Sequence, residues 1–80
     1  MEVKNLSINW KVIPINRQRG YVGKWCMFHI SLDPQYKDEG TYMLHCDLPH
    51  ISVQHNIESI VECMGKAIQF FEEWKKGLEE

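Results

Sequence analysis

The sequence contains little proline or glycine and no long apolar run. Three prolines and five glycines are spread over 80 residues, without a repeat, a low-complexity tract or an interdomain linker. No segment approaches the roughly 18 consecutive apolar residues that a membrane-spanning helix needs. A hydrophobic content of 44% argues against intrinsic disorder. The composition predicts one small folded domain over residues 1–80, without a membrane segment.

Cysteine is scarce and odd in number. Cys26, Cys46 and Cys63 are widely spaced, and residues 1–7 lack the apolar run of a secretory signal. Disulfide frameworks use paired cysteines in oxidising compartments, so an odd count without a signal argues against one. We interpret the three cysteines as reduced core residues and expect a cytoplasmic location.

A strong charge of either sign is also missing. The formal net charge is −2 and the isoelectric point is about 6.1. General nucleic-acid binders show a clear basic excess, and a nucleic-acid mimic needs a far larger acidic excess than this. The balance favours a protein partner.

Polar and apolar residues alternate with the period of two that is typical of half-buried strands. The pattern predicts strands at residues 6–12, 21–32 and 41–48, and a short one at 51–54. A polar turn at 16–20 reads as the tip of a hairpin. In the second strand, Cys26 shares a face with Phe28, whereas Met27 shares the other with His29.

The last third of the chain has the spacing of an amphipathic helix. Asn56 is the expected N-cap, and Glu72 with Lys76 forms an expected surface pair. Apolar residues recur every three or four positions: Ile57, Ile60, Val61, Met64, Ala67, Ile68, Phe71, Trp74 and Leu78. The predicted fold is α+β, an antiparallel sheet of three to four strands with one long C-terminal helix packed on one face.

One helix covers only one face of such a sheet, so the other face meets water, a homodimer mate or a partner. Methionine and aromatic residues together are typical of binding surfaces. The predicted partner-binding residues are Trp25, Met27, His29, Met43 and His45 on this face, with Arg17 and Arg19 at the hairpin tip.

The histidines are the strongest candidates for a metal site. His29, His45 and His50 with Asp47 could ligate zinc, which would allow a metal-dependent hydrolase. Their spacing matches no established zinc motif, and the cysteines alternate with core residues rather than polar ones. We therefore expect a non-enzymatic protein without a metal or cofactor.

A basic hairpin offers a different function. Arg17, Arg19 and Lys24 lie near Tyr21 and Trp25. Arginine beside an aromatic ring can hold a single-stranded nucleic acid by charge and stacking. The net charge makes a solvated turn the preferred interpretation, with nucleic-acid binding as the alternative.

The segment 41–74 resembles the HicB family of antitoxin domains. The resemblance rests on Asp47-Leu48-Pro49 at the end of a strand, a short strand at 51–54, and a helix that runs from Glu58 through Lys66-Ala67-Ile68. It implies a partial, catalytically inactive RNase H-like sheet with a packed helix. Members of that family bind a small ribonuclease toxin, and some carry a DNA-binding segment.

The functional expectation is therefore a small antitoxin-like inhibitor that occludes a partner protein, either a toxin or a nuclease. An alternative is a phage or mobile-element anti-defence protein that inhibits a host immune effector. A second alternative is a nucleic-acid-binding module that uses the basic hairpin. A homodimer is a further expectation, since symmetric pairing covers an open sheet face or edge.

Overall fold

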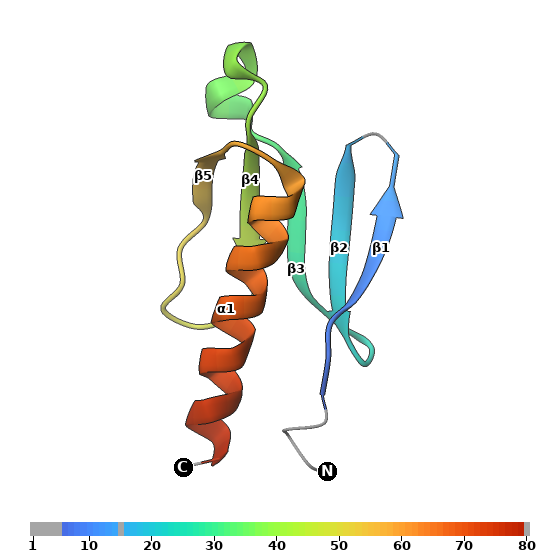
Figure 1. The fold of residues 1–80 in the computed structure, drawn as a ribbon, viewed down its shortest axis with the longest axis vertical. Helices are drawn as coiled ribbons and strands as arrows, with labels where there is room; N and C mark the ends of the chain where they lie inside the picture. Colours follow the sequence, from blue (N-terminus) through green and yellow to red (C-terminus); the bar gives the residue numbers. More distant parts are fainter. Residues whose placement is uncertain (1–5, 15, 80) are drawn as a thin grey trace.

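A five-stranded antiparallel sheet and one long helix form the fold in the computed structural model, which describes residues 6–14 and 16–79. The strands follow one another in the sheet in chain order, and the helix packs on one side of them (Figure 1). The expected α+β class is confirmed, with more strands than expected. The elements are β1 (Asn9–Ile13), β2 (Arg17–Val22), β3 (Trp25–Leu32), the short 3₁₀ helix η2 (Pro34–Glu39), β4 (Tyr42–Cys46), β5 (Gln54–Ile57) and α1 (Ile60–Glu79).

The additional strand arises because the predicted strand 21–32 is two strands. Gly23 has a φ of +64° and turns the chain between β2 and β3. The first hairpin tip is consequently shorter than predicted, and Arg17 and Arg19 lie inside β2 rather than in a turn. Lys24 belongs to the turn after β2. The expectation that Arg17, Arg19 and Lys24 form one basic hairpin tip is therefore wrong.

The last strand and the helix also begin later than predicted. Asn56 lies in β5 with a φ of +56°, so it is not the N-cap. Ser59 takes that role, because its Oγ accepts a hydrogen bond of 3.1 Å from the N–H of Glu62. Near the other end, Glu72 pairs with Lys75 at 3.2 Å rather than with Lys76.

The helix contacts β3, β4 and β5, while the β1–β2 hairpin stands beside it (Figure 1). Its spacing of three and four residues presents one apolar stripe to the sheet. Cys63, Ala67 and Phe71 in this stripe are buried against Phe28 and Leu44, among others. Among the residues that the structure describes, no helix packs on the opposite face of the sheet.

A β-bulge at Met27 decides which side chains reach that open face. Gly20 is paired with Phe28 and Tyr21 with Cys26, so Met27 is the extra residue on β3. Met27 and Phe28 are both buried in the core. The alternation therefore shifts by one position at the bulge, and Cys26 joins the open face although the sequence predicts the core.

Candidate functional site

A row of basic side chains crosses four strands on the open face of the sheet. Lys11 of β1 is paired with Arg19 of β2, Arg19 with His29 of β3, and His29 with His45 of β4. The residues that flank the row in β2, β3 and β4 are buried, except for the half-buried Gln18, so strand alternation places the row on the opposite side. His29 and His45 are cross-strand neighbours, as a hairpin between the predicted strands 21–32 and 41–48 would make them. We call these four residues the basic row.

Two further side chains extend the basic row along β2. Tyr21 lies two residues from Arg19 on the same face, and the ammonium of Lys11 lies 5.2 Å from the centre of its ring. Arg17 lies two residues from Arg19 in the other direction and is exposed. The face thus combines fixed positive charges with planar rings and guanidinium groups. Such groups can hold an anion and stack on flat ligands.

The charge of this face differs from that of the whole chain. None of the five strands that the structure describes contains Asp or Glu. The acidic residues of the described part of the chain lie in α1, among them Glu62, Glu72 and Glu73, and in the connecting segments. Asp47 follows β4 by one residue, but its carboxylate accepts a hydrogen bond of 2.8 Å from Trp25 Nε1. The open face of the sheet is therefore positively charged, although the net charge of the chain is −2.

His29 is the most perturbed member of the basic row. Burial lowers its pKa below the ordinary value, and the positive charges of Arg19 and Arg17 and the neighbouring His45 lower it further. Its Nε2 atom is buried and has no hydrogen-bond partner among the described residues. A buried nitrogen without a partner is costly, so Nε2 is an unsatisfied polar atom within the basic row.

Two of the predicted partner-binding residues do not lie on the open face. Met27 is fully buried, and Trp25 packs edge-on against Trp74 of the helix with ring centres 5.8 Å apart. Both corrections follow from the bulge, because it turns Trp25 and Met27 to the helix side. Met43 is half-buried beside Ser31 on the open face, as expected. Binding by any of these residues stays a prediction.

The candidate metal and thiol chemistry is not assembled in the described residues. They contain no group of three or more His, Cys, Asp or Glu side chains that could hold a metal ion. His50 lies in the loop after β4 with a φ of +67°. Burial raises the pKa of Cys46, and it raises that of Cys63 to about 11 with help from Glu62. These thiols are protonated at neutral pH and are poor nucleophiles.

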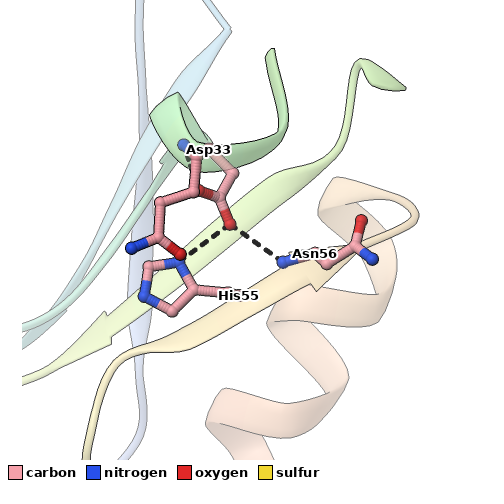
Figure 2. Close-up of polar contacts among 4 residues, drawn as sticks. Asp33, His55 and Asn56 are labelled. Carbon is pink, nitrogen blue, oxygen red and sulfur yellow. Dashed lines mark hydrogen bonds and ion pairs between the residues drawn. The ribbon is translucent and has the colours of Figure 1, made fainter. Parts of the chain in front are cut away.

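A second polar cluster surrounds the buried carboxylate of Asp33, which follows β3. Its Oδ1 accepts a hydrogen bond of 3.0 Å from the N–H of Gln35. Its Oδ2 lies 2.9 Å from both the N–H of Asn56 and Nδ1 of His55, as Figure 2 shows. Burial alone would raise the pKa of Asp33, but these hydrogen bonds lower it below the ordinary value.

This Asp33 cluster joins the end of β3 to the edge strand β5. An ionised carboxylate only accepts, so His55 donates from Nδ1. In the sequence, Asp33 stands between the predicted strand 21–32 and Pro34, and this position by itself does not indicate the cluster. The Asp-Pro dipeptide predicts the local turn to Gln35. No local signal predicts contact with His55 and Asn56, more than 20 residues away along the chain.

An apolar groove lies on the helix side of the molecule. Its volume is about 230 Å³. Ile68 on its rim is 48% exposed. The segment before β1, Trp10 and the second half of the helix line it: Leu6, Ser7, Ile8, Trp10, Ile68, Phe71 and Glu72.

Comparison of the chain with protein-family models, with curated proteins and with solved structures found no match. The resemblance to HicB antitoxins thus stays a prediction that rests on the Asp47-Leu48-Pro49 motif and the helix pattern. Within the part of the chain that the structure describes, no helix is both long and apolar enough to span a membrane.

Proposed function

We propose that this protein is a non-catalytic nucleic-acid-binding module that holds its ligand on the open face of the sheet. The observation that carries the proposal is the basic row, Lys11–Arg19–His29–His45, in register across four strands without an acidic residue among them. Phosphate groups are the anions that such a row fits, because Arg and Lys bind phosphate by charge and hydrogen bonds.

The net charge is not an argument against this function. Electrostatic attraction acts at the surface that meets the ligand, and charges beyond a Debye length of about 8 to 10 Å are largely screened at physiological salt. The acidic residues Glu62, Glu72 and Glu73 belong to the helix, which packs on the other side of the sheet. A locally basic face on an acidic chain can therefore bind a polyanion.

The test is binding of random-sequence 30-nucleotide RNA and DNA, measured by fluorescence anisotropy at low and moderate salt. We expect Arg17→Ala combined with Arg19→Ala to weaken binding at least about tenfold, because two phosphate contacts are lost. The control removes two charges from the helix, Lys66→Ala with Lys76→Ala, and should leave the affinity nearly unchanged. Equal losses in both double variants, or no binding at low salt, would contradict the proposal.

An antitoxin-like inhibitor of a toxin or nuclease is the second candidate, and the apolar groove favours it. A dry cavity of about 150 Å³ holds benzene, so a groove of about 230 Å³ has room for one aromatic or branched aliphatic anchor side chain of a partner protein. This function would be supported by a partner protein that is captured from lysate in a one-to-one complex at moderate salt and that does not bind the Ile68→Glu variant. The same partner protein would also have to bind the Arg17→Ala, Arg19→Ala variant.

A further inference from the structure

We infer that the open face takes a single strand of nucleic acid rather than a duplex, by stacking bases on Tyr21 beside the basic row. The inference rests on the proposed function and specifies its ligand. Three features of the described residues carry it: the width of the face, the kind of planar groups on it, and the number of fixed charges.

The width of the basic row does not suit a duplex. Four adjacent strands are separated by three steps, so the row spans about 14 Å from Lys11 to His45. The major groove of B-DNA is about 12 Å wide and admits a helix or a two-stranded ribbon. A four-stranded face cannot enter it. On the outside of a duplex the row would follow less than half of a helical turn of about 34 Å.

The planar groups of the open face suit unpaired bases. Tyr21 is half-buried, and its ring lies against the ammonium of Lys11. His45 is exposed one strand beyond His29, and Arg19 separates Tyr21 from these histidines along the sheet surface. Aromatic rings, imidazoles and guanidinium groups all stack on bases. In a duplex those base surfaces are already stacked on their neighbours.

The number of fixed charges limits the affinity and predicts its salt dependence. Lys11, Arg17 and Arg19 are the lysine and arginine residues on the open face in the described strands. For single strands the logarithm of the affinity falls with the logarithm of the salt concentration with a slope of about −0.7 for each neutralised phosphate. Three contacts give a slope of about −2, and the Arg17→Ala, Arg19→Ala variant should show about −0.7.

The experiment compares single-stranded 10-nucleotide RNA and DNA with a duplex of the same sequence, by fluorescence anisotropy over a salt series. We expect the single strand to bind at least about tenfold more tightly than the duplex. Tyr21→Leu should weaken single-strand binding at least about fivefold without changing the salt slope, since it removes stacking and no charge. Tyr21→Phe keeps the ring and should retain the affinity.

The outcomes distinguish a failure of the single-strand inference from a failure of the proposed nucleic-acid binding. Duplex affinity equal to or above that of the single strand overturns the inference and leaves nucleic-acid binding standing. Single-strand binding that is indifferent to Tyr21→Leu also overturns it, because the strand would then lie elsewhere. Absence of binding to every oligonucleotide at low salt removes both. Circular dichroism of each variant checks that it is folded.

Discussion

Gly20 in β2 is a position at which the side chains of Ile8 and Trp10 approach the backbone closely. A Cβ atom at this position would lie 2.9 Å from Cγ2 of Ile8 and 2.9 Å from Cζ3 of Trp10. Trp10 in turn packs against Phe28, with ring centres 6.2 Å apart. Glycine therefore lets the side chains of Ile8 and Trp10 lie close to the backbone of β2, while the pairing of β1 with β2 places Lys11 at the end of the basic row.

The first prediction compares two Gly→Ala changes. Gly20→Ala should lower the free energy of unfolding by roughly 1–3 kcal/mol, because the added methyl overpacks the contact with Ile8 and Trp10. Gly65→Ala should raise it by about 1 kcal/mol, since Gly65 lies in the helix and a Cβ there meets no atom within 4 Å. Urea denaturation of both variants measures the difference. Equal effects of the same sign would contradict the packing described for Gly20.

Asp33 supports the second prediction, which concerns pH. Its pKa in the folded protein is below the ordinary value. Its ionised form thus contributes stability above the unfolded-state pKa of about 4, and that contribution disappears as the pH falls through the folded-state pKa. Asp33→Asn should lower the melting temperature at pH 6 by about 5 °C or more, and should flatten the dependence of stability on pH below 4.

The control for Asp33 is another carboxylate in the same connection. Asp38→Asn changes an exposed residue between β3 and β4 and should leave both quantities within error. Denaturation at several values between pH 2.5 and 6 makes the comparison. A wild-type-like pH profile for Asp33→Asn would mean that the hydrogen bonds from Gln35, His55 and Asn56 do not favour the ionised form.

At the scale of elements, the pairing of β2, β3 and β4 makes the candidate site. Arg19, His29 and His45 belong to three strands, and only antiparallel register sets them side by side. The neutral form of His29 is favoured in the free protein, because burial and the adjacent positive charges lower its pKa. A bound phosphate would favour the charged form instead.

The third prediction follows from these opposite effects of the free protein and of a bound phosphate on the pKa of His29. Ligand binding should take up a proton, so nucleic-acid affinity should rise as the pH falls from 7.5 to 5.5, by about tenfold where one proton is linked over one pH unit. His29→Gln with His45→Gln should remove most of the rise. The control is His50→Asn, which changes an exposed histidine outside the basic row. Asparagine tolerates the positive φ at this position, and this variant should retain the rise in affinity. Anisotropy titrations across this range provide the measurement.

At the scale of the whole molecule, the two sides of the sheet carry different chemistry. The helix side holds the apolar core and the acidic side chains of α1, while the open side holds the basic row. A domain of 80 residues has a thin stability margin, so a ligand that binds only the folded state should stabilise it measurably.

The fourth prediction quantifies that stabilisation. A single-stranded oligonucleotide at about 100 times its dissociation constant contributes about 2.7 kcal/mol, which raises the melting temperature of a domain of this size by roughly 10–20 °C. The Lys66→Ala, Lys76→Ala variant should show the same increase, and the Arg17→Ala, Arg19→Ala variant at the same ligand concentration a much smaller one. Identical increases in the two variants would place the ligand away from the open face. Differential scanning fluorimetry is sufficient for this comparison.

Much of this architecture can be predicted from local sequence pattern. Alternation of polar and apolar residues indicates strands, and the spacing of Met64, Ala67 and Phe71 indicates a helix with one apolar stripe that packs on the core. The pairing of His29 with His45 also follows from the sequence once a hairpin is assumed. These features depend on residues close together in the chain, whose periodicity reports directly on which side is buried.

Tertiary structure alone decided which side chains share the open face. A bulge at Met27 reverses the alternation before it, and it depends on how β2 and β3 align rather than on a local signal. Asp33 accepts a hydrogen bond from Asn56 of the edge strand β5, a contact between distant parts of the chain, and the helix begins only at Ile60. The sequence determines the total charge and the periodic pattern. The separation of basic and acidic residues onto two sides arises only when strands distant in the chain align.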